Sequence, residues 1–135
     1  KIIAGQIPCH LVHETDDLLA FLDVNPLALG HTLIIPRGHY TRIDEVPGEV
    51  SAAIGGVLPE VAQAVRQAVG CKGVNILQNN GSVAGQVVDH VHFHVIPKWA
   101  DTGLIMRWDA GQLPPGEAAE TLAVTIRGQL TQPTS

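Results

Sequence analysis

The chain has 135 residues, of which 45% are hydrophobic and 16% charged, and its formal net charge at pH 7 is −5. This length suits one domain with its own core, and no apolar run is long enough for a membrane span or a signal peptide. Only eight residues are Lys or Arg and they form no basic run, which disfavours nucleic-acid polymers and anionic membranes as partners. Cys9 and Cys71 lack the spacing of a disulfide framework, and we expect a cytoplasmic protein.

Five strands are expected where apolar and polar residues alternate or where a short apolar run lies between turn residues. They cover residues 9–14, 18–22, 32–35, 74–78 and 90–96. Between the third and fourth strands, a helix is expected to start at Pro47 and to be kinked or split by Gly55, Gly56 and Pro59. Its apolar stripe, at helical spacing, would face the sheet and consists of Val50, Ile54, Val57, Val61 and Val65.

A second helix is expected at residues 117–130, after the Pro-Pro-Gly sequence at 114–116. Its apolar stripe predicts that it docks on the rest of the chain, through Ala119, Leu122, Ala123, Ile126 and Leu130. The fold class is therefore α+β, with a mostly antiparallel five-stranded sheet, one main helix and a C-terminal helix. We find no repeat and expect a single domain over residues 1–135.

The last strand is the most informative stretch, because its polar positions are all histidines. His90, His92 and His94 share one face, whereas the alternate residues Val91, Phe93 and Val95 would be buried. A lone histidine on a strand is usually structural, but three in register favour a functional site. One imidazole can act as a neutral nucleophile or base while another donates a proton.

Strand geometry bears on whether the histidines bind metal or act covalently. At about 3.3 Å per residue, the Cβ atoms of His90 and His94 would lie roughly 13 Å apart. Two imidazoles on one zinc, at ~2.1 Å from the ion, can bridge only about 11 Å. One zinc ion therefore cannot bind all three, although a pair such as His90 and His92 could still bind one with a further ligand.

A loop rich in Asn and Gly precedes the histidines at residues 78–88. Gly81 and Gly85 permit backbone conformations that direct several N–H groups at one anion, and Asn79 and Gln86 add amide donors. No Lys-Ser/Thr follows the second glycine, so the loop is not a P-loop. Such runs are more often ordinary turns; this one leads directly to the histidines.

Two segments resemble the histidine triad (HIT) family of nucleotide hydrolases and transferases. They are HVHFHVI at residues 90–96, preceded by AGQ at 84–86, and LAFLDVNP at 19–26, followed by GHTLIIP at 30–36. The likeness runs from Lys1 to about Trp108 and is strongest to the bacterial nucleotide-binding (Hint-like) branch. Residues from about 109 to 135 fall largely outside it.

The resemblance implies roles for the catalytic residues. His92 matches the nucleophile that attacks the α-phosphorus, forming a nucleotidyl-histidine that water resolves. His94 matches the residue that contacts the phosphoryl group and helps protonate the leaving group, and His90 matches the supporting histidine. Gln86 joins these catalytic residues and, with Asn79, Gly85 and the backbone around Val87, matches the phosphate cradle.

The nucleoside end of the site is implied in the same way. Asp23 matches the carboxylate that accepts hydrogen bonds from both ribose hydroxyls, although such an Asp also caps turns. The apolar walls of a purine pocket match Ile2, Ile7, Phe21, Leu22 and Leu33, which would look the same as core residues. The implied substrate is an AMP-type purine nucleotide, and the implied assembly is a homodimer.

Two positions depart from the family pattern. Val87 stands where relatives often have Ser or Thr, so the hydroxyl that aids the leaving group is replaced by a methyl-bearing side chain. Asp89 adds negative charge directly before the triad. This leads to the hypothesis that Asp89 slows the turnover of polyphosphate substrates or favours substrates with amine leaving groups. An Asp89→Asn variant with the same substrate ranking would refute that hypothesis.

No cofactor and no metal ligand are expected in this chain. Some bacterial relatives hold a structural zinc with two cysteines, a histidine matching His39 and one matching His90. Cys9 aligns with neither cysteine, so zinc is expected only if cysteines exist upstream of Lys1. The remaining histidines, His10, His13 and His31, are expected to be surface or structural.

The sequence thus predicts a metal-independent purine nucleoside phosphoramidate hydrolase or related nucleotidyl hydrolase. Dinucleoside polyphosphate cleavage is an alternative within the enzymes. A zinc-binding protein that uses two of the histidines and a nucleotide-binding module with little turnover are alternatives from other classes.

Overall fold

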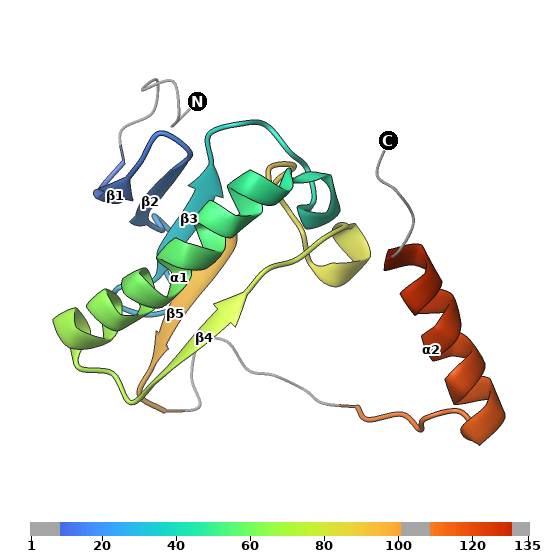
Figure 1. Cartoon of the computed structure of the whole chain (residues 1–135). Coiled ribbons are helices and arrows are strands. Elements are labelled where there is room, and N and C mark those ends of the chain that lie inside the picture. Colours follow the sequence, from blue (N-terminus) through green and yellow to red (C-terminus); the bar gives the residue numbers. More distant parts are fainter. Residues whose placement is uncertain (1–8, 101–108, 131–135) are drawn as a thin grey trace. The chain divides into compact units, whose positions relative to one another are not determined.

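Five antiparallel strands form one sheet (Figure 1). The computed structural model describes residues 9–100 and 109–130, so the predictions for Ile2 and Ile7 lie outside the described residues. The strands are β1 (Leu11–Glu14), β2 (Leu18–Leu22), β3 (Thr32–Pro36), β4 (Gly73–Leu77) and β5 (Phe93–Lys98). Their order in the sheet is β1-β2-β3-β5-β4, and every neighbouring pair is antiparallel. The α+β prediction is confirmed.

The histidine strand begins later than predicted. β5 starts at Phe93, so His90 and His92 precede the strand and only His94 lies within it. The chain before Phe93 is held instead by tertiary bonds, since the Val91 N–H donates to the carbonyl of Tyr40 at 2.7 Å. The alternation is nevertheless kept in part, because Val91 and Val95 are fully buried.

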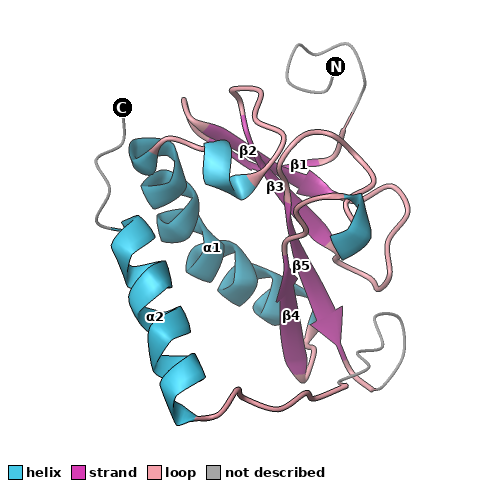
Figure 2. Cartoon of the chain, turned by 90° about the vertical axis from the view of Figure 1, so that its right-hand side faces the viewer, coloured by secondary structure: helices cyan, strands magenta, loops and turns pink. Residues whose placement is uncertain are grey.

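One long helix, α1 (Gly48–Val69), covers one face of the sheet, as Figure 2 shows. Its predicted stripe faces the strands, and Ile54, Val61 and Val65 pack in one core with Ile34 and Val95. The helix is continuous through Pro59, so the predicted split is wrong. Pro59 and the residue four positions earlier are both exposed, where water can bond the carbonyl that loses its N–H partner.

A smaller apolar cluster lies on the strand positions that alternate with this core. Leu19, Phe21 and Ile35 are buried together, with Leu33 and Cys9 packed against them. Because successive strand residues point to opposite faces, this cluster lies on the face that α1 does not cover. The side chain of His94 lies on the same face as this cluster, because His94 pairs directly with Leu33.

The chain divides into two compact units, and the second contains α2 (Gly116–Leu130). The C-terminal helix is thus confirmed, but no residue of it is buried, and Leu122 and Ile126 are more than half exposed. The docking of its apolar stripe stays a prediction. No helix among the described residues is long and apolar enough to cross a membrane.

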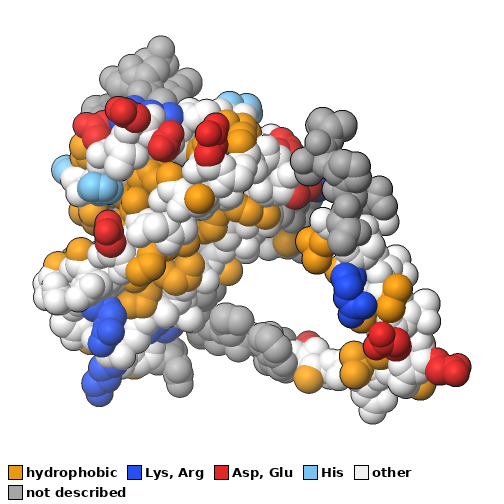
Figure 3. All heavy atoms as spheres, viewed as in Figure 1, with side chains coloured by type: hydrophobic (Ala, Val, Ile, Leu, Met, Phe, Trp, Pro, Cys, Tyr) orange, Lys and Arg blue, Asp and Glu red, His pale blue; other side chains and the backbone are white. Residues whose placement is uncertain are grey.

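Lys and Arg side chains lie scattered on the face drawn in Figure 3, where those of the described residues form no continuous basic patch. Acidic and hydrophobic side chains occupy much more of it. This distribution agrees with the net charge of −5 and gives a polyanion little to bind on that face.

Candidate active site

The register of the central strands aligns part of the predicted site. Phe21 on β2 pairs with Leu33 on β3, and Leu33 pairs with His94 on β5. These three side chains therefore form a row across the sheet on the face opposite α1. Leu22 is one position out of register with this row and is 38% exposed, so strand alternation separates it from the predicted apolar wall.

The orientation of His92 leaves one ring nitrogen available. Nδ1 of His92 lies 2.7 Å from the carbonyl oxygen of His90. A carbonyl only accepts, so Nδ1 must carry the proton and the neutral ring has its lone pair at Nε2. The turn at His90 and His92 thus fixes the tautomer that a nitrogen nucleophile requires.

His94 belongs to a chain of hydrogen bonds that begins at a backbone amide. The Leu27 N–H donates to Nδ1 of His31 at 3.0 Å, so the neutral His31 ring carries its proton on Nε2. Nε2 of His31 lies 2.9 Å from Nδ1 of His94, so His31 donates this hydrogen bond and His94 accepts it. His94 is left with its proton on Nε2, free to act as a donor.

Burial keeps the rings of His94 and His31 neutral. It is the main cause that lowers the pKa of His94 to about 4, and the neighbouring His92 and His31 lower it further. Burial also lowers the pKa of His31, against the opposing effect of the Asp23 carboxylate. At neutral pH both rings are therefore uncharged, as the chain of single donors and acceptors requires.

His90 takes no part in the hydrogen bonds between His31 and His94, and its ring lies at the end of β3. Its Nε2 donates to the carbonyl of Pro36 at 3.0 Å, which leaves Nδ1 as the acceptor. Nδ1 of His39 lies 3.2 Å from that atom. Burial lowers the pKa of His90, with the Pro36 hydrogen bond acting against it. The structure thus brings together His39 and His90, the two histidines that match zinc ligands in the resemblance.

A different group of possible metal ligands occurs beside His94. Among the described residues, Asp23, His31 and His94 have ligand atoms that all lie within 4.8 Å of one another. The hydrogen bonds argue against a metal there, since Nε2 of His31 carries a proton as long as Leu27 N–H occupies Nδ1. The group is better explained as a hydrogen-bonded relay.

Asp23 follows β2 directly and has two roles in the structure. Its Oδ1 accepts the backbone N–H of Asn25 at 2.9 Å, which is the turn-capping arrangement considered from the sequence. Its Oδ2 lies 3.5 Å from Nε2 of His31, with the side chain 17% exposed. The carboxylate is therefore at the edge of the relay and partly open to a ligand.

The glycines of the predicted cradle adopt the conformations expected of them. Gly81 and Gly85 have φ values of 88° and 94° and flank η2 (Ser82–Ala84). Asn79 Nδ2 approaches the carbonyl of Gly85 at 3.4 Å. Within the part of the chain that the structure describes, no acceptor takes the backbone N–H of Val87, whose side chain is 91% exposed.

Gln86 has internal partners for its whole amide. Its Nε2 donates to the carbonyls of Thr41 at 2.6 Å and Val88 at 3.0 Å, and its Oε1 accepts the Gly81 N–H at 2.7 Å. The side chain is buried. Donation from Gln86 to a phosphate therefore stays a prediction, and it would require one of these bonds to break.

His31 is the residue in contact with the site whose place the sequence did not indicate. It is buried, with 2% of its surface exposed, which agrees with a structural histidine. Its contact with His94 joins residues 63 positions apart in the chain. The available signal was its position in the Gly-His-Thr-Leu-Ile-Ile-Pro segment, directly before a buried strand.

The lowered pKa values predict that the protein loses stability in acid. Histidines with an ordinary pKa of 6.5 bind protons in the unfolded chain at a pH where His94, His90 and His31 do not bind them in the folded chain. The unfolded state then binds more protons, so the unfolding free energy falls as pH drops from 6.5 toward about 4. Thermal unfolding followed by circular dichroism across this window measures the effect.

A matched pair of variants checks the cause of that acid loss. His94→Asn should flatten the dependence of the unfolding temperature on pH, because it removes a group with a lowered pKa. His10→Asn, at an exposed position, should leave it as in the unmodified chain. Equal slopes in the two variants would refute the assignment to His94.

The fold and the site define a class of α+β protein. In this class, histidines lie just before and within β5, and a loop with two glycines leads to them. The chain matches the HIT domain family over residues 4–101. It belongs to the HIT family.

Among its relatives, "Uncharacterized HIT-like protein MJ0866" of Methanocaldococcus jannaschii is 48% identical over 109 residues, covering 80% of this chain and 83% of that protein. "Adenosine 5'-monophosphoramidase hnt1" of Schizosaccharomyces pombe is 45% identical over 118 residues, covering 87% and 86%. The crystal structure of a HIT family protein from Bacillus anthracis superposes with a TM-score of 0.88 at 34% identity, covering 97% of this chain and 94% of that one. The family resemblance is confirmed, and the relatives include proteins named adenosine 5'-monophosphoramidase and adenylylsulfatase.

Proposed function

We propose that this protein hydrolyses purine nucleoside phosphoramidates or related adenylates at the α-phosphorus through a nucleotidyl-His92 intermediate. The observation that carries the proposal is the pair of fixed tautomers, an unprotonated Nε2 on His92 and a protonated Nε2 on His94. Their rings lie 4.9 Å apart between centroids. The relatedness to a 5'-monophosphoramidase supports the same substrate class.

The reaction then has two displacements at phosphorus. Nε2 of His92 forms a bond to the α-phosphorus while the bond to the leaving amine breaks, and the amine departs with a proton from solvent while Nε2 of the neutral His94 donates a hydrogen bond to it. Water next attacks phosphorus, the bond to His92 breaks, and AMP and a proton are released. Asn79 and the backbone N–H of Val87 are the donors proposed for the non-bridging oxygens.

Nucleoside binding is assigned to Asp23 and to the two apolar members of the row across the sheet. Phe21 and Leu33 would contact the base, and the partly exposed carboxylate of Asp23 would accept the ribose hydroxyls. Neither interaction involves the bonds that break, so both contribute mainly to substrate binding.

Replacing Asp23 should weaken substrate binding through the ribose. In Asp23→Asn we expect KM to rise roughly 10- to 100-fold, the equivalent of about 1.5–3 kcal/mol for hydrogen bonds to a charged group. Steady-state kinetics with the ribo- and 2',3'-dideoxyribo-phosphoramidates separates this role from an effect on His31. The unmodified protein should prefer the ribo substrate and Asp23→Asn should not; a retained preference would contradict the assignment.

The proposal requires no metal. The pairing of His39 with His90 would suit a structural zinc if cysteines precede Lys1, and such a zinc lies outside the chemistry proposed here. A homodimer is also part of the proposal, and sedimentation analysis of the chain tests it. The decisive experiment for the function is AMP release from adenosine phosphoramidate in excess EDTA.

A further inference from the structure

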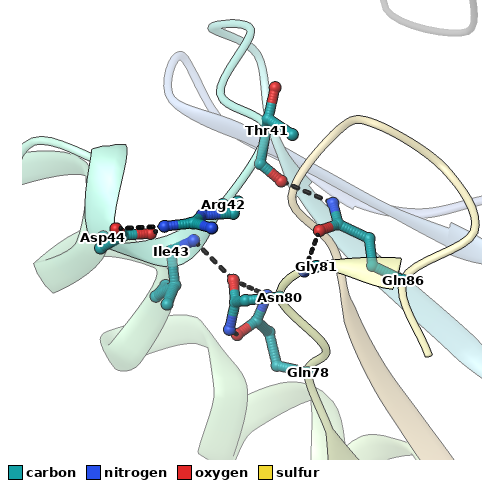
Figure 4. Close-up of polar contacts among 8 residues, drawn as sticks. All are labelled: Thr41, Arg42, Ile43, Asp44, Gln78, Asn80, Gly81 and Gln86. Carbon is teal, nitrogen blue, oxygen red and sulfur yellow. Dashed lines mark hydrogen bonds and ion pairs between the residues drawn. The ribbon is translucent and has the colours of Figure 1, made fainter. Parts of the chain in front are cut away.

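Two side-chain amides, of Asn80 and Gln86, fasten the loop at residues 78–88 to the segment before α1, and a third, of Gln78, holds Asn80, as Figure 4 shows. We name Gln78, Asn80 and Gln86 the amide clamp. Asn80 Oδ1 accepts the backbone N–H of Ile43 at 2.7 Å and Nε2 of Gln78 at 3.0 Å, and Asn80 Nδ2 donates to Gln78 Oε1 at 2.6 Å. Every polar atom of the Asn80 side chain therefore has a partner within the protein.

Gln86 closes the loop from its other end. Its Oε1 accepts the N–H of Gly81, while its Nε2 reaches the carbonyl of Thr41 at 2.6 Å. Thr41 and Ile43 belong to one short segment, so Asn80 and Gln86 attach both ends of the loop to the same support.

That support is itself held by regular structure. It lies between β3, which ends at Pro36, and α1, which starts at Gly48. Beyond the loop, the Val91 N–H bonds the carbonyl of Tyr40 at 2.7 Å and His90 Nε2 bonds that of Pro36 at 3.0 Å. The support thus fixes the loop and the turn that orients His92.

A loop with two glycines at positive φ is costly to order unless other bonds restrain it. Donors stabilise developing charge most when they are held in place before the reaction. We propose that the amide clamp preorganises the cradle loop for the phosphoryl group, with Asn80 as a positioning residue that acts through the backbone rather than on the substrate. This inference rests on the proposed function.

The test compares three variants of the full chain with adenosine phosphoramidate. Asn80→Ala removes the bond to Ile43 and should lower kcat by about 10- to 100-fold with a smaller change in KM, as displacements near 1 Å do. Asn80→Asp keeps the acceptor for Ile43 and should recover part of the lost kcat. Gln67→Ala, which removes an exposed amide of α1, is the control and should match the unmodified protein.

Hydrogen exchange adds a readout that does not depend on turnover. The backbone amides of residues 81–88 should exchange faster in Asn80→Ala than in Asn80→Asp, while those of α1 stay unchanged. Unchanged kcat in Asn80→Ala would overturn the clamp. A loss that Asn80→Asp does not reduce and that follows a general fall in unfolding temperature would overturn it too. Failure of the unmodified protein to release AMP would instead refute the proposed function.

Discussion

His92→Ala is expected to abolish AMP release from adenosine phosphoramidate, with a loss of roughly 10⁴- to 10⁶-fold, as removal of a covalent nucleophile causes elsewhere. The reason is geometric, because the His90 carbonyl fixes the proton on Nδ1 and leaves Nε2 as the attacking atom. Alanine removes that atom, and the other histidine that bonds a backbone carbonyl, His90, has its acceptor nitrogen next to His39 instead. Release should be unaffected by EDTA in the unmodified protein.

The covalent step provides a second measurement. Rapid acid-free quenching followed by mass spectrometry should detect an adenylyl adduct on the unmodified chain and none on His92→Ala, since phosphorus–nitrogen bonds of histidine survive base but not acid. His13→Ala, at an exposed position of β1, is the control that should retain both adduct and turnover. Turnover that survives in His92→Ala would exclude the proposed nucleophile, and turnover lost only with EDTA would favour a metal-dependent reaction.

The sequence predicted the strands best where burial alternates over several residues. β2 begins and ends at the predicted residues, and β3 differs by one, because Leu19 and Ile35 pack on one face while Ala20 and Ile34 pack on the other. The continuity of α1 through Pro59 was not predicted. The helix-breaking tendency of proline is outweighed there by the packing of the apolar stripe of α1 on the sheet. The carbonyl that loses its N–H partner is exposed, so water can bond it.

Within the site, residue identity was more predictable than orientation. The alternation placed His90, His92 and His94 on one strand face, whereas His90 is drawn to the Pro36 carbonyl and only His94 enters β5. These are contacts between distant segments, which periodicity does not encode. The same holds for the tautomers, because the proton on each ring depends on partners such as Leu27 and His31 that lie elsewhere in the chain.

His31→Leu is expected to lower kcat by about 10²-fold, within the range that proton transfer contributes, with a smaller effect on KM. Leucine cannot donate to Nδ1 of His94, so that ring is free to carry its proton on either nitrogen. His31 also lowers the pKa of His94. Its removal should therefore raise that pKa from about 4, by part of the shift only, since burial is the main cause.

The dependence of kcat on pH distinguishes this role from simple packing. The acidic limb of the profile should move to higher pH in His31→Leu, because His94 then becomes protonated at a higher pH than in the unmodified protein. His31→Gln, whose amide can donate toward His94, should recover part of kcat and move the limb back. His10→Leu, at an exposed position, controls for the loss of an imidazole. A folded His31→Leu with unchanged kcat and an unchanged acidic limb would show that His94 sets its own tautomer without this partner.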